Sequence, residues 1–112
     1  MKIIKLEKSP IKNKRLRVFL DNGDKYDFGL DGGHTYIEHN DKTKRRNYFQ
    51  RHMGNATENT RICRLIPSAA LFSAFILWGR HKSIAANTKE LNHLWKHPEK
   101  ASAIIASIMN YV

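Results

Sequence analysis

The chain has 112 residues and a formal net charge of +10, from 20 Lys and Arg against 10 Asp and Glu. This length allows one domain with a modest hydrophobic core and excludes an enzyme built from two lobes around a catalytic cleft. The charge surplus favours polyanionic partners, because neutralised phosphates release their counterions, and an acidic protein surface satisfies the same electrostatics.

No segment is typical of an exported or membrane-spanning protein. The first ten residues lack the apolar stretch of a secretory signal, so we expect no export by that route. The most apolar run, residues 65–78, is interrupted by Pro67 and is shorter than the roughly 20 residues that span a bilayer. Cys63 is the single cysteine, cannot form an internal disulfide, and is expected to be a small buried side chain.

The first thirty residues are predicted to form antiparallel β structure. Ile4 and Leu6 are expected on the core face of a short first strand. In the next strand, residues 15–20, apolar side chains alternate with Arg15 and Arg17, which we expect on the outer face of the sheet.

A hairpin is predicted at Asp21–Asp24. Asn22 and Gly23 both tolerate the positive φ of a two-residue type I′ turn, which would return the chain as a third strand over residues 25–30. The glycines of residues 29–33 then form a tight crossover out of the sheet. They do not form a phosphate loop, because no Lys-Ser or Lys-Thr pair follows them.

After residue 40 the spacing of apolar residues changes from the alternation of a strand to the period of a helix. Tyr36 and Ile37 are expected in a last strand or an irregular crossing, and Asn40 or Asp41 is expected to cap a helix over residues 42–53. The predicted core face of this helix carries Tyr48, Phe49 and His52. The predicted outward face carries Lys42, Arg45 and Arg46.

The rest of the chain is predicted to be mainly helical. Residues 55–66 are expected to form a loop, and Ser68 begins a buried helix that Gly79 ends in the left-handed position common after helices. Further helices are expected over residues 83–95 and from Pro98 to the end of the chain. The last helix has an apolar stripe of Ile104, Ile105, Ile108 and Met109. We interpret the stripe as core, with self-association as the alternative.

Together these elements predict one α+β domain over residues 1–112. A small antiparallel sheet of three to four strands, mainly within residues 1–39, is packed by about four helices within residues 40–112.

The segment from His34 to His52 is the strongest functional signal, because it concentrates cationic, imidazole and aromatic side chains. Guanidinium and ammonium groups attract the phosphates of nucleic acid or the carboxylates of an acidic protein. The candidate polyanion-binding residues are Arg15, Arg17, Lys42, Lys44, Arg45, Arg46 and Arg51.

Other chemistry is possible in the same segment. His34, His39 and His52 with Asp41 would form a metal set only if the chain brought them together, and their spacing matches no zinc signature. A metal-dependent nuclease with a histidine as general base is the catalytic form of this idea. We expect no cofactor, no bound metal and no catalytic centre.

The aromatic and imidazole groups also have structural interpretations. Tyr36, Tyr48 and Phe49 would stack on bases only if their rings were exposed. His39 and His52 would otherwise belong to a polar corner tied to Asp41 or Glu38. Likewise, a buried ion pair between Arg51 and Asp41 would make the motif part of the scaffold.

The chain resembles a family of small basic proteins of giant nucleocytoplasmic DNA viruses, for which no activity is established. The resemblance covers roughly residues 14–95. It rests on Phe28-Gly29, Tyr36, His39, Asp41, Arg45, Tyr48 and Arg51-His52, on the apolar block from Ala70 to Trp78, and on Ser83-Ile84. It implies a viral protein packaged in the virion and present in the host cytoplasm or the viral factory during infection.

We therefore expect a non-enzymatic, virion-associated structural protein that contacts DNA or another polyanion. The alternative is a minor capsid or assembly protein whose basic patches meet acidic faces of neighbouring virion proteins, with Trp95 or the C-terminal stripe as apolar anchor. A metal-dependent nuclease is the third and least favoured interpretation.

Overall fold

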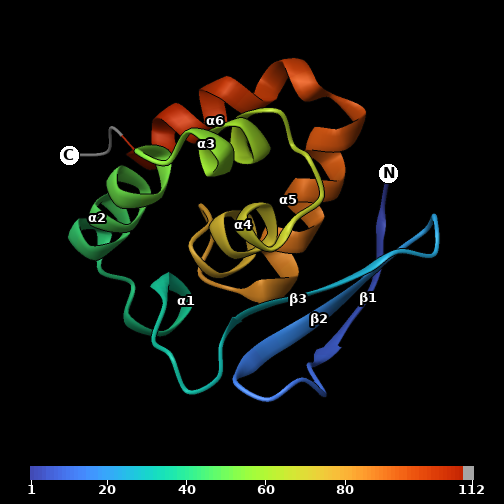
Figure 1. Cartoon of the computed structure of the whole chain (residues 1–112). Helices are drawn as coiled ribbons and strands as arrows, with labels where there is room; N and C mark the ends of the chain where they lie inside the picture. Colours follow the sequence, from blue (N-terminus) through green and yellow to red (C-terminus); the bar gives the residue numbers. More distant parts are fainter. Residues whose placement is uncertain (110–112) are drawn as a thin grey trace.

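The computed structural model describes residues 1–109 and has an α+β fold (Figure 1). The strands are β1 (Ile3–Lys8), β2 (Lys14–Leu20) and β3 (Lys25–Leu30). The helices are α1 (Tyr36–His39), α2 (Lys42–Met53), α3 (Ala56–Cys63), α4 (Ala69–Phe72), the π-helical segment η1 (Ser73–Leu77), α5 (Ile84–Lys96), the 3₁₀ turn η2 (Pro98–Lys100) and α6 (Ala101–Met109).

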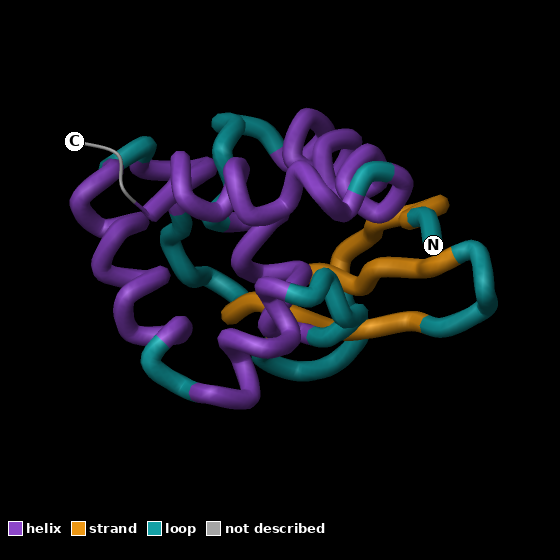
Figure 2. Tube along the Cα trace, turned by 90° about the horizontal axis from the view of Figure 1, so that it is seen from above, coloured by secondary structure: helices purple, strands orange, loops and turns teal. Residues whose placement is uncertain are grey.

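The helices form two levels above the sheet. The strands pair antiparallel in the order β1-β2-β3, and α4 and η1 pack against β3. The outer helices α2, α3 and α6 contact one another, and α3 also contacts α4 (Figure 1). Seen from above, the strands gather at one side of the molecule and α2 lies toward the opposite side (Figure 2).

The central hairpin confirms the predicted antiparallel pairing of the second and third strands and the alternation of apolar side chains onto one face. Val18 lies opposite Tyr26 and Leu16 lies opposite Phe28. Val18 and Phe28 are completely buried, because alternation places every second side chain of each strand against the helices.

The first strand differs from the prediction in which isoleucine faces the core. Ile3 is 5% exposed whereas Ile4 is 62% exposed. The register with β2 shifts between Ile3 and Lys5, so a bulge at this point interrupts the alternation, and Leu6 then returns to the core face opposite Val18. A count of alternating positions cannot foresee this extra residue.

The hairpin turn has three residues rather than the predicted two. Leu20 N–H donates to Asp24 O (2.9 Å), and Gly23 N–H donates to Leu20 O (3.1 Å). Within this turn only Gly23 has positive φ, at 92°. This is the pattern of a type I turn followed by a glycine bulge, so the predicted type I′ turn is wrong.

Two segments predicted to be irregular are helical. The single turn α1 replaces the expected last strand or irregular crossing, and Thr35 and Glu38 form a capping box at its start. Helix α3 replaces most of the expected loop, because Asn55 caps it by accepting the Glu58 N–H (3.1 Å). A helix this short is not stable alone, and the fully buried Ile62 holds it against the core.

The apolar segment after Ser68 is a buried helix as predicted, divided between α4 and η1. Ser68 Oγ caps it by accepting the Leu71 N–H (3.2 Å). Gly79 follows but is not left-handed, so its expected capping role is wrong. A Cβ at Gly79 would overlap the Phe75 carbonyl oxygen and lie 2.8 Å from the Asn87 side-chain amide, so glycine is required here for close packing.

The C-terminal stripe belongs to the core. Ile105 and Ile108 are buried, and α6 packs on α2 and α3. The face considered for self-association is therefore used inside the domain. The part of the predicted last helix at residues 110–112 lies outside the described residues.

Two remaining expectations concern the burial of Cys63 and the presence of a membrane-spanning segment. Cys63 is exposed rather than buried, because α3 turns it outward, and its Sγ donates to Asn59 Oδ1 (3.3 Å). Across residues 1–109, none of the helices combines the length and the apolar character needed to cross a membrane.

Candidate nucleic-acid interface

Helix α2 forms where it was predicted, and its N-terminus explains why. The Asp41 carboxylate accepts the backbone N–H groups of Thr43 (2.9 Å) and Lys44 (3.1 Å), which would otherwise lack partners. The helix itself, from Lys42 to Met53, contains no Asp or Glu. Its exposed surface is therefore purely cationic and polar.

The exposed arc of α2 has an ordered distribution of side chains. Uncharged hydrogen-bonding residues run along its middle: Thr43, Asn47 and Gln50. Exposed cations border this row on both sides, with Lys42 and Arg46 on one and Lys44 and Arg51 on the other. Among residues 1–109, no carboxylate forms an ion pair with Lys44, Arg46 or Arg51.

Arg45 points into the protein, so its expected outward orientation is wrong. It is 4% exposed, and its guanidinium lies 4.0 Å from the centroid of the Tyr36 ring. Its Nη1 donates to the Gly79 carbonyl oxygen (3.0 Å). Arg45 thus joins α1, α2 and the segment after η1, and burial removes it from the candidate interface.

The aromatic residues of the motif are also internal. The rings of His39, Trp78, Tyr48 and His52 follow one another with centroid separations of 5.3, 4.4 and 4.2 Å. Tyr48 and Trp78 are nearly parallel, at 6°. Tyr36, Tyr48 and Phe49 are buried, so they are not available to stack on bases.

The two sheet arginines, Arg15 and Arg17, each have a carboxylate partner. Arg15 makes two 2.8 Å hydrogen bonds to Glu38, and Arg17 makes bonds of 3.0 and 3.1 Å to Asp27 on the neighbouring strand. Both pairs are bidentate, the geometry in which guanidinium binds carboxylate best. Because these two charges are locally cancelled, Arg15 and Arg17 do not extend the basic surface of α2.

Replacing Glu38 with Gln should remove a contribution to the free energy of unfolding that is itself lost at acidic pH. The Arg15 guanidinium, with the N–H and hydroxyl of Thr35, lowers the pKa of Glu38 from 4.5 to about 2. Because the folded-state pKa is the lower one, this contribution is complete above about pH 4.5 and is lost as the pH falls toward 2. Solvent access to the pair limits it to about 1 kcal/mol.

Urea unfolding at about pH 6 and about pH 3 measures this contribution. Glu38→Gln should show a smaller loss of unfolding free energy between the two pH values than the parent protein. Glu7→Gln, at an exposed position on β1, is the control and should follow the parent. Equal losses in the parent and in Glu38→Gln would contradict the prediction.

A cavity of 510 Å³ opens beside the C-terminal half of α2. Its charged and imidazole groups come from three elements: Lys14 of β2, His52 of α2, and Glu58 and Arg61 of α3. His52 Nδ1 lies 2.6 Å from Glu58 Oε2, so Nε2 is the ring nitrogen that can contact a ligand. The cavity can therefore offer two cations and an oriented imidazole to one anionic group.

Sequence reasoning missed Lys14, Glu58 and Arg61. The signal for the last two was present, because Asn55 followed by Glu58 is a helix N-terminal pattern that predicts α3 and places Glu58 and Arg61 one turn apart. No local signal brings Lys14 to them, because that contact depends on the packing of the sheet against the helices.

The histidines do not converge on one site. His39 Nδ1 accepts the Asp41 N–H (2.9 Å), so the expected link to Asp41 runs through its backbone, whereas His52 bonds Glu58. Arg51 is exposed and makes no ion pair with Asp41, so the predicted alternative of a buried Arg51–Asp41 ion pair is wrong. In the described part of the chain, no three His, Cys, Asp or Glu side chains gather as a metal site requires.

Comparison with known proteins gives one match. A family model described as a family of unknown function (DUF5754) matches residues 4–52, which run from β1 through most of α2 and include the His34–His52 segment. Neither the curated proteins nor the solved structures contain a match.

Proposed function

We propose that the protein binds the phosphate backbone of DNA through the exposed face of α2. The observation that carries this proposal is a helix of 12 residues with four exposed cations and no carboxylate. Lys42, Lys44, Arg46 and Arg51 form the interface. Arg45 is left out because it is buried, and Arg15 and Arg17 are left out because each pairs with a carboxylate.

The distribution of side chains on α2 fits a helix lying along a groove of the duplex. The major groove of B-DNA admits an α-helix, and the cations on the two sides of the exposed arc would then face the two phosphate strands. Thr43, Asn47 and Gln50 would face the groove floor. Contacts to phosphate dominate this arrangement, so affinity should depend steeply on salt and weakly on sequence.

The neighbouring cavity adds to the same surface. Arg61 and Lys14 line it together with Tyr48 and His52 of α2, so its cations continue the positive region of the helix. In the virion setting that the viral resemblance implies, such a surface suits DNA packaging. The capsid alternative loses support, because Ile105 and Ile108 of the stripe are buried and the Trp95 indole donates to the Leu65 carbonyl oxygen within the domain.

Reversing three cations of α2 should abolish most of the DNA affinity at physiological salt. In the variant Lys44→Glu/Arg46→Glu/Arg51→Glu, we expect the slope of log affinity against log salt to fall in magnitude by about 3, because each lost phosphate contact removes about one unit. Fluorescence anisotropy with labelled double-stranded DNA across a salt series measures the slope.

The control is Lys12→Glu/Lys25→Glu/Lys100→Glu, which has the same net charge and changes exposed residues away from α2. It should retain most of the slope of the parent protein. Equal losses in both variants would show that only overall charge matters, and salt-independent binding by the parent protein would contradict the proposal itself.

Phosphodiester hydrolysis is a second candidate, favoured by the bond between His52 and Glu58. A carboxylate that fixes one imidazole nitrogen leaves the other oriented for proton transfer, and Arg61 and Lys14 would stabilise phosphate charge beside it. The length of the DNA after the same titration, with and without Mg²⁺, tests this function. Intact DNA under both conditions would exclude it.

A further inference from the structure

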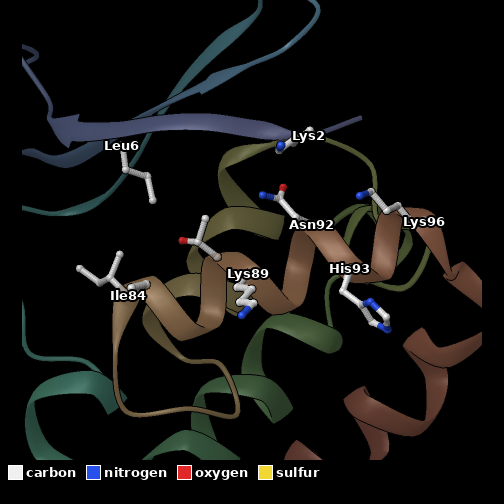
Figure 3. A pocket seen from close by; sticks show the side chains of 9 residues that line it. Lys2, Leu6, Ile84, Lys89, Asn92, His93 and Lys96 are labelled. Carbon is white, nitrogen blue, oxygen red and sulfur yellow. The ribbon is translucent and has the colours of Figure 1, made fainter.

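A separate groove of 780 Å³ lies between β1 and α5, here called the β1–α5 groove (Figure 3). Leu6 of β1 and Lys2, which directly precedes the strand, line it from one side. One face of α5 lines it from the other side, with the residues Ile84, Ala85, Thr88, Lys89, Asn92, His93 and Lys96. Its volume lies within the range usual for small-molecule sites.

The two ends of the groove differ in polarity. Leu6 and Ile84 lie at one end, and Lys2, Asn92 and Lys96 gather at the other (Figure 3). From Ile84 to Lys96 the helix rises about 18 Å. The groove is therefore a single elongated site with an apolar end and a cationic end.

The cationic end has a fixed geometry. Asn92 Oδ1 accepts the Ile3 N–H (2.7 Å) and Asn92 Nδ2 donates to the Ile3 carbonyl (3.2 Å). These two bonds tie α5 to β1 at this end of the groove. The groove is thus a preformed feature of the fold, since its two walls are joined directly.

The charges that line the groove indicate an anionic ligand. The groove is lined by three lysines, Lys2, Lys89 and Lys96, and by no Asp or Glu. A carboxylate or a phosphate at the cationic end would therefore meet charged groups of opposite sign alone.

We propose that the β1–α5 groove binds a single-chain amphiphile with an anionic head, either a carboxylate or a phosphate monoester. The head lies toward Lys2 and Lys96, and the alkyl chain covers Leu6, Ile84 and Ala85. Nucleic acid does not fit this description, because its backbone has no alkyl segment for the apolar end. The site is therefore independent of the surface on α2.

The first test is an NMR titration of the full chain with monomeric sodium dodecanoate and dodecyl phosphate. Both should shift the amide signals of residues 84–96 and of β1 in a saturable manner. Sodium acetate, which has the head alone, should produce no saturable shift, and dodecyltrimethylammonium should bind far more weakly. Equal binding of the cationic and anionic chains, or shifts elsewhere in the protein, would overturn the proposal.

The second test uses paired charge variants. Lys2→Glu/Lys96→Glu should weaken dodecanoate binding about tenfold or more, because both cations near the head are reversed. Lys5→Glu/Lys100→Glu has the same net charge and changes exposed lysines outside the groove, so it should bind like the parent. Equal weakening in the two variants would contradict a specific head-group site.

Vesicles distinguish a free amphiphile from a membrane surface. Phosphatidylcholine vesicles with and without anionic lipid serve as the probe in a sedimentation assay. Saturable dodecanoate binding at the groove supports the proposal, whether or not anionic vesicles also bind. Binding to anionic vesicles without any binding of monomeric dodecanoate would overturn it, because surface charge alone would then account for the attraction.

Discussion

Replacing Arg45 with Met should lower the free energy of unfolding by about 3 kcal/mol. The substitution leaves the Gly79 carbonyl without its donor and removes the cation over the Tyr36 ring, both in a buried environment. A buried acceptor that loses its partner keeps its full desolvation cost. The loss should appear as a lower urea midpoint in equilibrium unfolding followed by far-UV circular dichroism.

Arg46→Met is the matched control, because it changes the next residue to the same side chain at an exposed position. Its unfolding free energy should change by less than about 0.5 kcal/mol. The two variants should behave oppositely in DNA binding, with folded Arg45→Met close to the parent and Arg46→Met weakened. A stable Arg45→Met with weakened DNA binding would show that Arg45 belongs to the interface after all.

Replacing Gly79 with Ala should lower the free energy of unfolding by about 3 kcal/mol or prevent stable folding. The new methyl group would overlap the Phe75 carbonyl oxygen and press on the Asn87 side chain. Asn87 is itself buried and donates to the carbonyls of Ile76 (2.9 Å) and His81 (3.0 Å), so it cannot move aside without losing these bonds. Thermal and urea unfolding measure the effect.

Gly54→Ala is the control for this substitution. Gly54 has φ of −71°, which alanine adopts without strain, and a Cβ there would meet no atom closer than 3.4 Å. Its stability should stay within about 0.5 kcal/mol of the parent or rise slightly, because alanine restricts the unfolded chain. A tolerated Gly79→Ala would show that η1 and α5 can separate, contrary to the packing described above.

Secondary structure was predictable wherever a local signal was strong. Asp41, Ser68 and Ser83 each cap a helix through their own side chain, so the starts of α2, α4 and α5 can be found from neighbouring residues alone. The hairpin was found in the same way. The missed elements α1 and α3 are short, and their apolar periodicity extends over too few residues to stand out.

The candidate interface was only partly predictable. Periodicity separates a buried face from an exposed face, but it assigns charged residues to the exposed face by default, and Arg45 is an exception that depends on Tyr36 and Gly79. The ion pairs of Arg15 and Arg17, which were predicted to extend the basic surface, could not be foreseen for a related reason. Whether a cation pairs with a carboxylate depends on residues that can be far away in the chain, as Glu38 lies 23 positions from Arg15.

The sequence by itself determined the α+β class, the hairpin between the second and third strands and the extent of α2, because caps, turns and apolar periods act over a few residues. It also determined the large positive charge and thereby the kind of partner that we propose. Only the tertiary structure decided which cations are exposed, that His52 pairs with Glu58, and that β1 and α5 enclose a groove. These features depend on how separate elements pack, α2 with α3 for His52 and Glu58 and β1 with α5 for the groove, and that packing follows from the whole core.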